Sequence, residues 1–283
     1  MNLNYYSQNV KIGDYYYPTH LSKISSPPKN IFIKGNLTQK LTQNTLGIVG
    51  TRSMSKYGEQ VLDKLFSELN VANISIVSGF MYGVDAYAHK KAIEYNFHTV
   101  AVMPCGIDIV HPVEQTPLYD KLLQIGGWVL SEFPGSAKPK IWSFPKRNRI
   151  IAGMSKILIV IEAGFRSGAI ITANFSHKFG REVYAVPGSI FNKVSFGCNK
   201  LIGEYAIPLH DVNQINEYYD KLIQNDGSEY EQILKLIPKN GIYKNKIYEN
   251  SDIPVYKLNQ LLSEMLIKGI IAEVGGRLCD NRN

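Results

Sequence analysis

The chain is poor in cysteine and in long apolar runs, and each scarcity excludes a class of protein. Its three cysteines, Cys105, Cys198 and Cys279, stand far apart without a CxxC pair, which argues against a zinc site and a disulfide framework. No apolar run reaches the roughly 20 residues that span a bilayer, and the first residues lack the apolar core of a signal peptide. We therefore expect a cytoplasmic protein without membrane association, metal or cofactor.

Acidic residues are also in deficit. The chain has 31 Lys and Arg against 24 Asp and Glu, a formal charge of +7, and its pI is near 9.1. This balance favours an acidic partner such as nucleic acid or anionic lipid. The charge is concentrated between Lys138 and Arg149, where KPKIWSFPKRNR holds five basic residues and two aromatic rings without an acidic residue.

Two nucleotide-binding signatures are missing, because the chain contains neither GxGxxG nor GxxxxGK[ST]. A dinucleotide site or a P-loop NTP site thereby loses its best support. What the chain does have is six short apolar runs that alternate with segments of helical period. These predicted strands are Leu46–Val49, Ile74–Ser78, Thr99–Met103, Trp128–Glu132, Ile157–Ile161 and Glu182–Val186.

Continuous apolar runs are typical of strands that are covered on both faces, as in a parallel sheet flanked by helices. We therefore predict an α/β protein with a Rossmann-like parallel sheet and a small C-terminal winged-helix domain. At 283 residues and 45% hydrophobic composition, the chain can bury a large core and form more than one domain. The predicted organisation is an N-terminal extension packed on the main domain (1–44), a Rossmann-like domain (45–212), a linker marked by an NDGS break (213–228) and a winged helix (229–283).

Parallel sheets place their functional loops at the carboxyl ends of the strands. The first predicted strand leads into GTRS, which would set Arg52 beside a helix terminus where a phosphate can bind. A later strand leads into EAGFRSG, which would place Arg166 and the amides near Ser167 and Gly168 on the same edge. Several cations are therefore expected to converge on one rim of the sheet.

The motifs that carry these loops occur together in a specific order. GIVGTRSMSKYG, IVSGFMYGVDAYAH, TVAVMPCGIDIVHP, LSEFP, FPKRNRIIAGMS, EAGFRSGAIITA, GREVYAVPGS and SFGCNKLI follow one another along the chain. In this order they closely resemble the DNA-processing protein DprA (Smf) family, over about Leu21 to Pro208.

The resemblance implies a bacterial cytoplasmic protein that binds single-stranded DNA, protects incoming DNA during natural transformation and loads the recombinase RecA onto it. It implies a homodimer without catalytic residues. A ring such as Phe144 can stack on an unpaired base, a contact of roughly 1–3 kcal/mol. Carried onto matching positions, the DNA-binding residues would be Arg52, Lys140, Phe144, Lys146, Arg147, Asn148, Arg149, Arg166, Ser167 and Gly168.

The chain departs from the family pattern in two places. Many members have a basic residue between the two glycines of the loop SGFMYGVD, which follows the second predicted strand and in this chain has Met81-Tyr82 at that place. A cation on that wall is therefore missing or replaced by a ring. From Ser228 to Asn283 the chain has eight Lys or Arg against seven Asp or Glu, so we expect the winged helix to contact protein or to bind DNA weakly.

Structural roles compete with these functional ones. Arg52 can cap or pair at a helix end, and Trp142 and Phe144 can be packing anchors. Since Arg147 and Arg149 diverge on a helix, we expect at least one to form an internal ion pair. Packing, capping or other structural roles are favoured over a nucleophile or metal ligands for Cys105, His89 and His111.

Two rival classes stay open. A nucleotide-processing phosphoribohydrolase-like enzyme of the same fold would assemble an acid/base site from carboxylates at this edge, although its PGGxGTxxE motif is absent. Its candidate residues are Asp85, Asp108, Glu132 and Glu162. A scaffold whose basic stretch meets an acidic protein would bind a partner but no short oligonucleotide.

Overall fold

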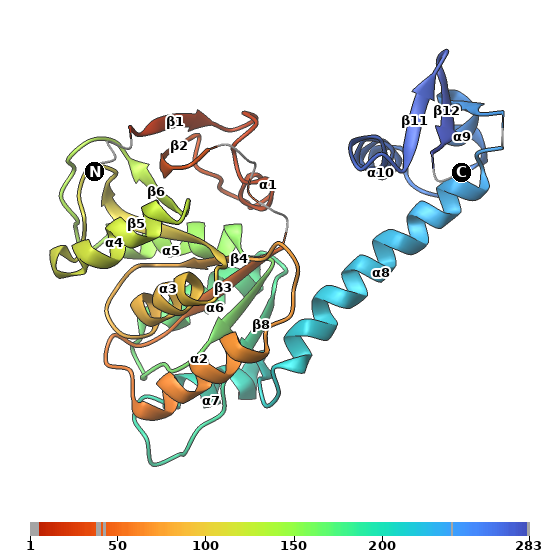
Figure 1. The fold of residues 1–283 in the computed structure, drawn as a ribbon. Coiled ribbons are helices and arrows are strands. Elements are labelled where there is room, and N and C mark those ends of the chain that lie inside the picture. Colours follow the sequence, from red (N-terminus) through yellow and green to blue (C-terminus); the bar gives the residue numbers. More distant parts are fainter. Residues whose placement is uncertain (1–5, 38–40, 42–43, 239, 282–283) are drawn as a thin grey trace. The chain divides into compact units, whose positions relative to one another are not determined.

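The computed structural model of the chain describes residues 6–281 except 38–40, 42–43 and 239. The chain divides into two compact units, residues 1–216 and 217–283. The first unit is built on a nine-stranded sheet with the order β1-β2-β6-β5-β4-β3-β7-β8-β9 (Figure 1). Its strands are β1 (Gln8–Lys11), β2 (Asn30–Gly35), β3 (Thr45–Val49), β4 (Ser75–Ser78), β5 (His98–Gly106), β6 (Trp128–Phe133), β7 (Ile157–Val160), β8 (Glu182–Ala185) and β9 (Ile207–Pro208).

The sheet is mostly parallel. All neighbours from β6 to β9 pair in parallel, whereas β1 and β2 add an antiparallel edge through the β2–β6 pair. The predicted Rossmann-like α/β fold is therefore confirmed. β2 contains the apolar run Ile31–Ile33, which attaches the amino-terminal segment to the sheet.

Helices cover both faces of the sheet. Neighbouring residues of β5 show this directly, because Val100 and Val102 belong to one buried cluster while Ala101 and Met103 belong to another. Side chains alternate between the two faces of a strand, so apolar layers lie on both. The helices of the first unit are α1 (Thr19–Ser22), α2 (Lys56–Glu68), α3 (Val84–Glu94), α4 (Thr116–Gln124), α5 (Ser143–Met154), α6 (Gly168–Lys178) and α7 (Phe196–Glu204).

Strand order reverses beside β3. The chain runs from β3 through β4 and β5 to β6 on one side, and then returns to place β7 on the other side of β3. The loops that follow β3 and β7 consequently diverge and leave a crevice at the carboxyl end of the sheet. In open α/β sheets this switch point is the usual ligand site.

The predicted linker is helical. One helix, α8 (Asn213–Lys235), runs through residues 213–228, so the break predicted at NDGS is wrong. Ile215 and Tyr219 are buried near its start, and Tyr230 and Ile233 are buried near its end. Burial of these side chains offsets the roughly 1 kcal/mol that a glycine costs inside a helix.

The second unit has a core of its own. Ile233, Ile247, Leu258, Leu262 and Met265 are fully buried in it. Its antiparallel sheet has the order β10-β12-β11. The elements after α8 are β10 (Ile242–Tyr243), α9 (Lys244–Asn250), α10 (Val255–Ile267), β11 (Ile271–Val274) and β12 (Arg277–Asp280). Helices followed by a hairpin agree with the predicted order of elements, and the winged-helix assignment stays a prediction.

Within the part of the chain that the structure describes, no helix has the length and apolar character that crossing a bilayer requires.

Candidate nucleic-acid interface

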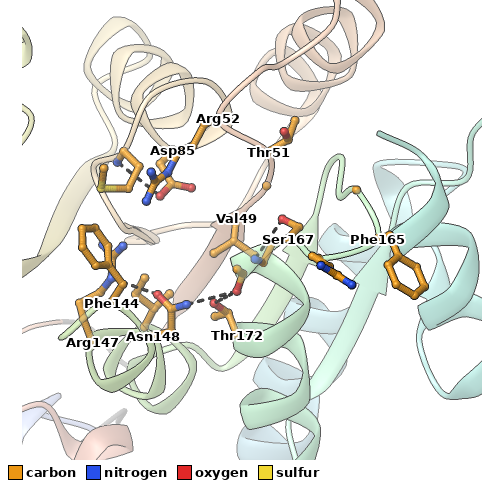
Figure 2. Close-up of a pocket in the computed structure, with 17 residues that line it drawn as sticks. Val49, Thr51, Arg52, Asp85, Phe144, Arg147, Asn148, Phe165, Ser167 and Thr172 are labelled. Atoms are coloured by element: carbon orange, nitrogen blue, oxygen red, sulfur yellow. Dashed lines mark hydrogen bonds between the residues drawn. The ribbon is translucent and has the colours of Figure 1, made fainter. Parts of the chain in front are cut away.

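A cavity of about 490 Å³ opens at the switch point. The loop after β3 contributes Thr51 and Arg52, the loop after β7 contributes Phe165 and Arg166, and α5 closes a third side. Figure 2 labels Thr51, Arg52 and Phe165 among the residues that line the pocket. We call this cavity the switch-point pocket.

Seven of the ten residues predicted to bind DNA line this pocket. They are Arg52, Phe144, Arg147, Asn148, Arg166, Ser167 and Gly168. Further lining residues that the sequence reasoning had not assigned to a DNA site include Val49, Gly50, Thr51, Met81, Asp85, Ile151, Gly164, Phe165, Ala169 and Thr172. Most of these follow directly on a predicted strand or belong to the same glycine-rich turns. Their closeness to these motifs in the sequence is the feature that could have identified them as pocket residues.

Arg52 forms the outer wall of the pocket. Its side chain is exposed, and its guanidinium carbon lies 5.4 Å from the centre of the Phe144 ring. Phe144 also contacts the His111 ring edge to face, with the ring centres 5.9 Å apart. Arg52 forms no ion pair within the described part of the chain. Its charge therefore remains available to an anion, beside a ring that is only partly covered.

Arg147 is buried and bonds within the protein, whereas a residue that contacts DNA is expected to lie on the surface. Arg147 is 4% exposed and donates from one guanidinium nitrogen to the carbonyl oxygens of Gly79 and Val102, the latter at 2.6 Å. Its Nε donates to Asn148 Oδ1 at 3.1 Å. The bonds to the two carbonyls fasten α5 to the end of β4 and to the middle of β5. We therefore describe Arg147 as a positioning residue of the pocket.

A buried carboxyl group lies next to this guanidinium. Burial raises the pKa of Asp85 to about 6, and the charge of Arg147 opposes that rise. Burial in turn lowers the pKa of Arg147 to about 10, with Asp85 opposing the shift. Gly79 separates the two groups so closely that a Cβ at this position would collide with both. The floor of the pocket is thus a tightly packed pair whose acid titrates near pH 6.

The start of α6 forms the inner wall. Ser167 is the N-cap, and its hydroxyl accepts from the backbone N–H of Ala169 at 3.2 Å. Asn148 Nδ2 donates to the Gly168 carbonyl at 3.2 Å, which connects α5 to the first turn of α6 (Figure 2). The exposed Arg166 precedes this turn and forms no ion pair among the described residues. A helix amino terminus and a nearby cation together favour anion binding.

Lys140, Lys146 and Arg149 lie outside the pocket lining. Arg149 donates to Glu132 Oε1 and to the Ser26 carbonyl, both at 2.6 Å. The pair with Glu132 is the internal ion pair that the spacing of Arg147 and Arg149 predicts, and it connects α5 to β6, whereas the bond to Ser26 connects α5 to the amino-terminal segment. Lys146 lies 3.4 Å from the same carboxylate and 5.0 Å from the centre of the Phe133 ring.

The remaining predicted residue, Lys140, lies near an exposed ring. Its Nζ is 6.0 Å from the centre of the Trp142 ring, and the Trp142 side chain is 55% exposed. Lys140 and Trp142 therefore remain candidates for the path of a strand outside the pocket.

At the position where many family members have a basic residue, the pocket wall is formed by Met81. This side chain is buried and lines the pocket. Tyr82 points its hydroxyl to Glu114 instead, donating at 2.6 Å, and this hydrogen bond raises the pKa of the phenol. The structure thus replaces the expected cation by an apolar side chain and not by the ring.

The carboxylates of the rival enzyme do not converge. Glu162 accepts from the backbone N–H and the hydroxyl of Ser55, which fixes the start of α2. Asp108 pairs with Lys34 at 2.5 Å, and Glu132 pairs with Lys146 and Arg149 of α5. Only Asp85 of this set lines the pocket. The contacts of the other three are structural.

Neither Cys105 nor His89 has the surroundings of a reactive group. Burial raises the pKa of the Cys105 thiol to about 11 and lowers that of His89 to about 3. The His89 Nδ1 shares a hydrogen bond of 2.7 Å with the Thr99 hydroxyl. In the part of the chain that the structure describes, no three His, Cys, Asp or Glu side chains cluster as metal ligands would.

Comparison with known proteins adds the family. The family model of the DNA recombination-mediator protein A matches residues 8–220. Protein Smf of Escherichia coli (strain K12) is 34% identical over 278 residues, which are 92% of this chain and 74% of that protein.

Two solved structures share the fold. DNA processing protein A (DprA) from Streptococcus pneumoniae is 37% identical with a TM-score of 0.69, covering 76% of this chain and 74% of that one. DNA processing protein A from Helicobacter pylori, whose structure concerns its single-stranded DNA binding mode, is 24% identical with a TM-score of 0.67, covering 78% and 98%. At that identity the second likeness shows the fold alone.

Proposed function

Because the chain belongs to the DNA recombination-mediator protein A family, we propose that it binds single-stranded DNA in the switch-point pocket. One observation carries the proposal. Two exposed arginines without carboxylate partners among the described residues, Arg52 and Arg166, flank the amino terminus of α6 in a single cavity. Fixed cations and helix-end N–H groups are the donors that phosphates require.

The rings favour an unpaired strand over a duplex. Phe144 is partly exposed in the pocket, next to the cation of Arg52. A base can stack on such a ring only when it is free of its complementary strand. The cavity of about 490 Å³ is also within the size range of sites for small ligands and single nucleotides. A base-paired helix is too large for it.

Beyond binding, we propose the wider role that the family resemblance implies. The protein would act in the cytoplasm as a homodimer, protect incoming DNA in natural transformation and load RecA onto it, without a catalytic step of its own. Pockets held in one dimer would raise the effective concentration of a second site for a long strand. The contacts of Asp108, Glu132 and Glu162 described above agree with a binding protein.

A binding titration tests the proposal. Single-stranded and duplex oligonucleotides of equal length and base composition are compared over a series of salt concentrations, with fluorescence anisotropy as the readout. We expect the single strand to bind more tightly at every salt concentration, and its affinity to fall linearly on a logarithmic salt scale. Equal binding of both forms, or binding of neither, would overturn the proposed function.

A further inference from the structure

A second cavity adjoins the switch-point pocket. It has a volume of about 750 Å³ and lies between α2, α3 and the start of α4. We call it the α3–α4 groove. Arg52 lines both cavities, so the loop after β3 is the partition between them.

The partition is thin because of a close backbone approach. Gly83 has a φ of +71° and packs so tightly against the carbonyls of Thr51 and Arg52 that a Cβ would collide with both. The Val84 N–H donates to the Thr51 carbonyl at 3.2 Å. The loop after β3 and the start of α3 therefore lie between the two cavities, and the exposed Arg52 lines both.

The groove has a surplus of positive charge. Its two acidic residues are neutralised from outside, since Glu59 pairs with Lys56 at 2.6 Å and Glu94 pairs with Lys91 at 3.0 Å. Its three cations are Arg52, Lys90 and Lys121. None of these three forms an ion pair within the described residues.

The floor of the groove is apolar and contains a ring. Ile93 and Leu118 are partly buried there, beside Tyr87. The Lys90 Nζ lies 5.8 Å from the centre of the Tyr87 ring. Cations along the rim and a ring with apolar neighbours below are the combination that binds the phosphates and bases of a single strand.

We propose that the α3–α4 groove binds the continuation of the single strand whose first nucleotides occupy the switch-point pocket. This inference rests on the proposed function and extends it to a second segment of the same DNA. Continuity of the two cavities across Arg52 and the unpaired cations of the groove favour this occupant. An apolar protein segment would need no such surplus of charge.

The length of the oligonucleotide separates the two cavities experimentally. Oligothymidylates of about 6 and about 20 nucleotides are titrated against the wild-type protein and against the double variant Lys90→Gln and Lys121→Gln. We expect the variant to bind the long oligonucleotide about tenfold more weakly and the short one with an affinity changed less than about twofold. The salt slope for the long oligonucleotide should fall by about 1.4, which is about 0.7 for each phosphate that the variant no longer neutralises.

The matched control is the double variant Lys29→Gln and Lys178→Gln. It removes the same charge from exposed positions before β2 and in the last turn of α6, away from both cavities. We expect it to bind both lengths like the wild type. If the groove variant loses affinity equally for both lengths, or keeps wild-type affinity for the long one, the inference is wrong. If the wild type binds neither length, the proposed function itself fails.

Protection from acetylation tests the groove without a variant. The long oligonucleotide should shield Lys90 and Lys121 of the wild-type protein, whereas the short one should leave both reactive. Lys178 should stay reactive with either. If Lys90 and Lys121 stay fully reactive at a saturating concentration of the long oligonucleotide, the groove does not bind the strand. Another occupant, such as a protein segment, would then be the better explanation of the groove.

Discussion

At the residue scale, the two kinds of arginine in the site differ in what they contact. Arg52 is exposed and forms no ion pair within the described residues, whereas Arg147 is buried and donates hydrogen bonds to backbone carbonyls. An exposed cation contributes to binding, and a buried one contributes to the shape of the pocket. The same substitution at the two positions should therefore change different properties.

Arg52→Ala should weaken binding without loss of stability. The side chain is exposed, lies beside the Phe144 ring and forms no ion pair among the described residues, so its removal leaves no buried charge without its partner. We expect affinity for single-stranded oligonucleotides to fall for all sequences alike, with a salt slope reduced by about 0.7 because one phosphate is no longer neutralised. Titrations at several salt concentrations measure this, and an unchanged slope would argue against phosphate binding by Arg52.

Arg147→Ala should instead destabilise the first unit. The change leaves the carbonyls of Gly79 and Val102 without their donor and the Asp85 carboxyl without its neighbouring charge. Losing one partner of a buried charged pair costs about 3–5 kcal/mol. Urea unfolding curves of the variant and the wild type check this value. If the variant has wild-type stability and reduced affinity for DNA, Arg147 contacts DNA directly, as the sequence predicts.

Asp85 makes binding depend on pH. Burial raises its pKa to about 6, so the folded protein keeps this proton up to about pH 6, whereas an unfolded chain releases it near pH 4. Protonation removes a negative charge from the pocket lining. We therefore expect affinity for an oligothymidylate to rise as the pH falls from about 7 to about 5.

The control for this titration is Asp85→Asn, which keeps the shape and lacks the charge. His111 lies beside Phe144, and burial together with the charge of Arg52 lowers its pKa. Any pH dependence left in the variant would come from His111 and other groups. Equal pH profiles of variant and wild type would show that Asp85 does not act on the bound strand.

At the element scale, the strands were predictable and their surroundings were less so. Five of the six predicted strands agree with the observed bounds to within one residue at each end, because buried parallel strands are short continuous apolar runs. β5 is the exception and continues to Gly106, since its last residues are buried although Pro104 and Gly106 are poor strand formers. Burial of that kind depends on neighbours distant in sequence.

The site was predictable in its turns but not in its helix. Arg52, Arg166, Ser167 and Gly168 follow predicted strands, and the topology brings their loops together. On α5, however, the sequence does not show which basic side chains point inward. The acceptors of Arg147 and Arg149 are carbonyls and a carboxylate from other elements, and these contacts exist only in the folded chain.

Glu162→Gln tests the structural role of a carboxylate at the start of an element. Glu162 accepts two hydrogen bonds from Ser55, the N-cap of α2. The two donors point at different carboxylate oxygens, so a glutamine would place its NH2 group, which cannot accept, against one of them. We expect a loss of stability of about 1–3 kcal/mol, typical of a lost bond to a charged group.

Oligonucleotide binding by Glu162→Gln should remain near the wild-type level once the protein is folded. An assay for release of the base from nucleoside monophosphates accompanies the unfolding experiment. If the wild-type protein cleaves this glycosidic bond and the variant does not, the phosphoribohydrolase-like enzyme replaces the binding protein as the best explanation of the pocket.

At the scale of the whole molecule, the chain consists of two units with separate cores. The first unit holds the sheet and both cavities, and the second has its own buried cluster around Leu258 and Leu262. Units with cores of their own are expected to unfold in separate transitions. A ligand that binds one folded unit should stabilise that unit alone.

Calorimetry with and without an oligothymidylate can therefore locate the binding unit. At a free concentration about 100 times Kd, binding adds about 2.7 kcal/mol to the stability of the unit that holds the strand. We expect the larger transition, that of the sheet unit, to move to higher temperature and the smaller one to stay. The segment from Ser228 onward is nearly neutral in charge, which gives it little attraction for a polyanion. A shift of the smaller transition would instead assign strand binding to the C-terminal unit as well, and a shift of that transition alone would remove the pocket from the DNA path.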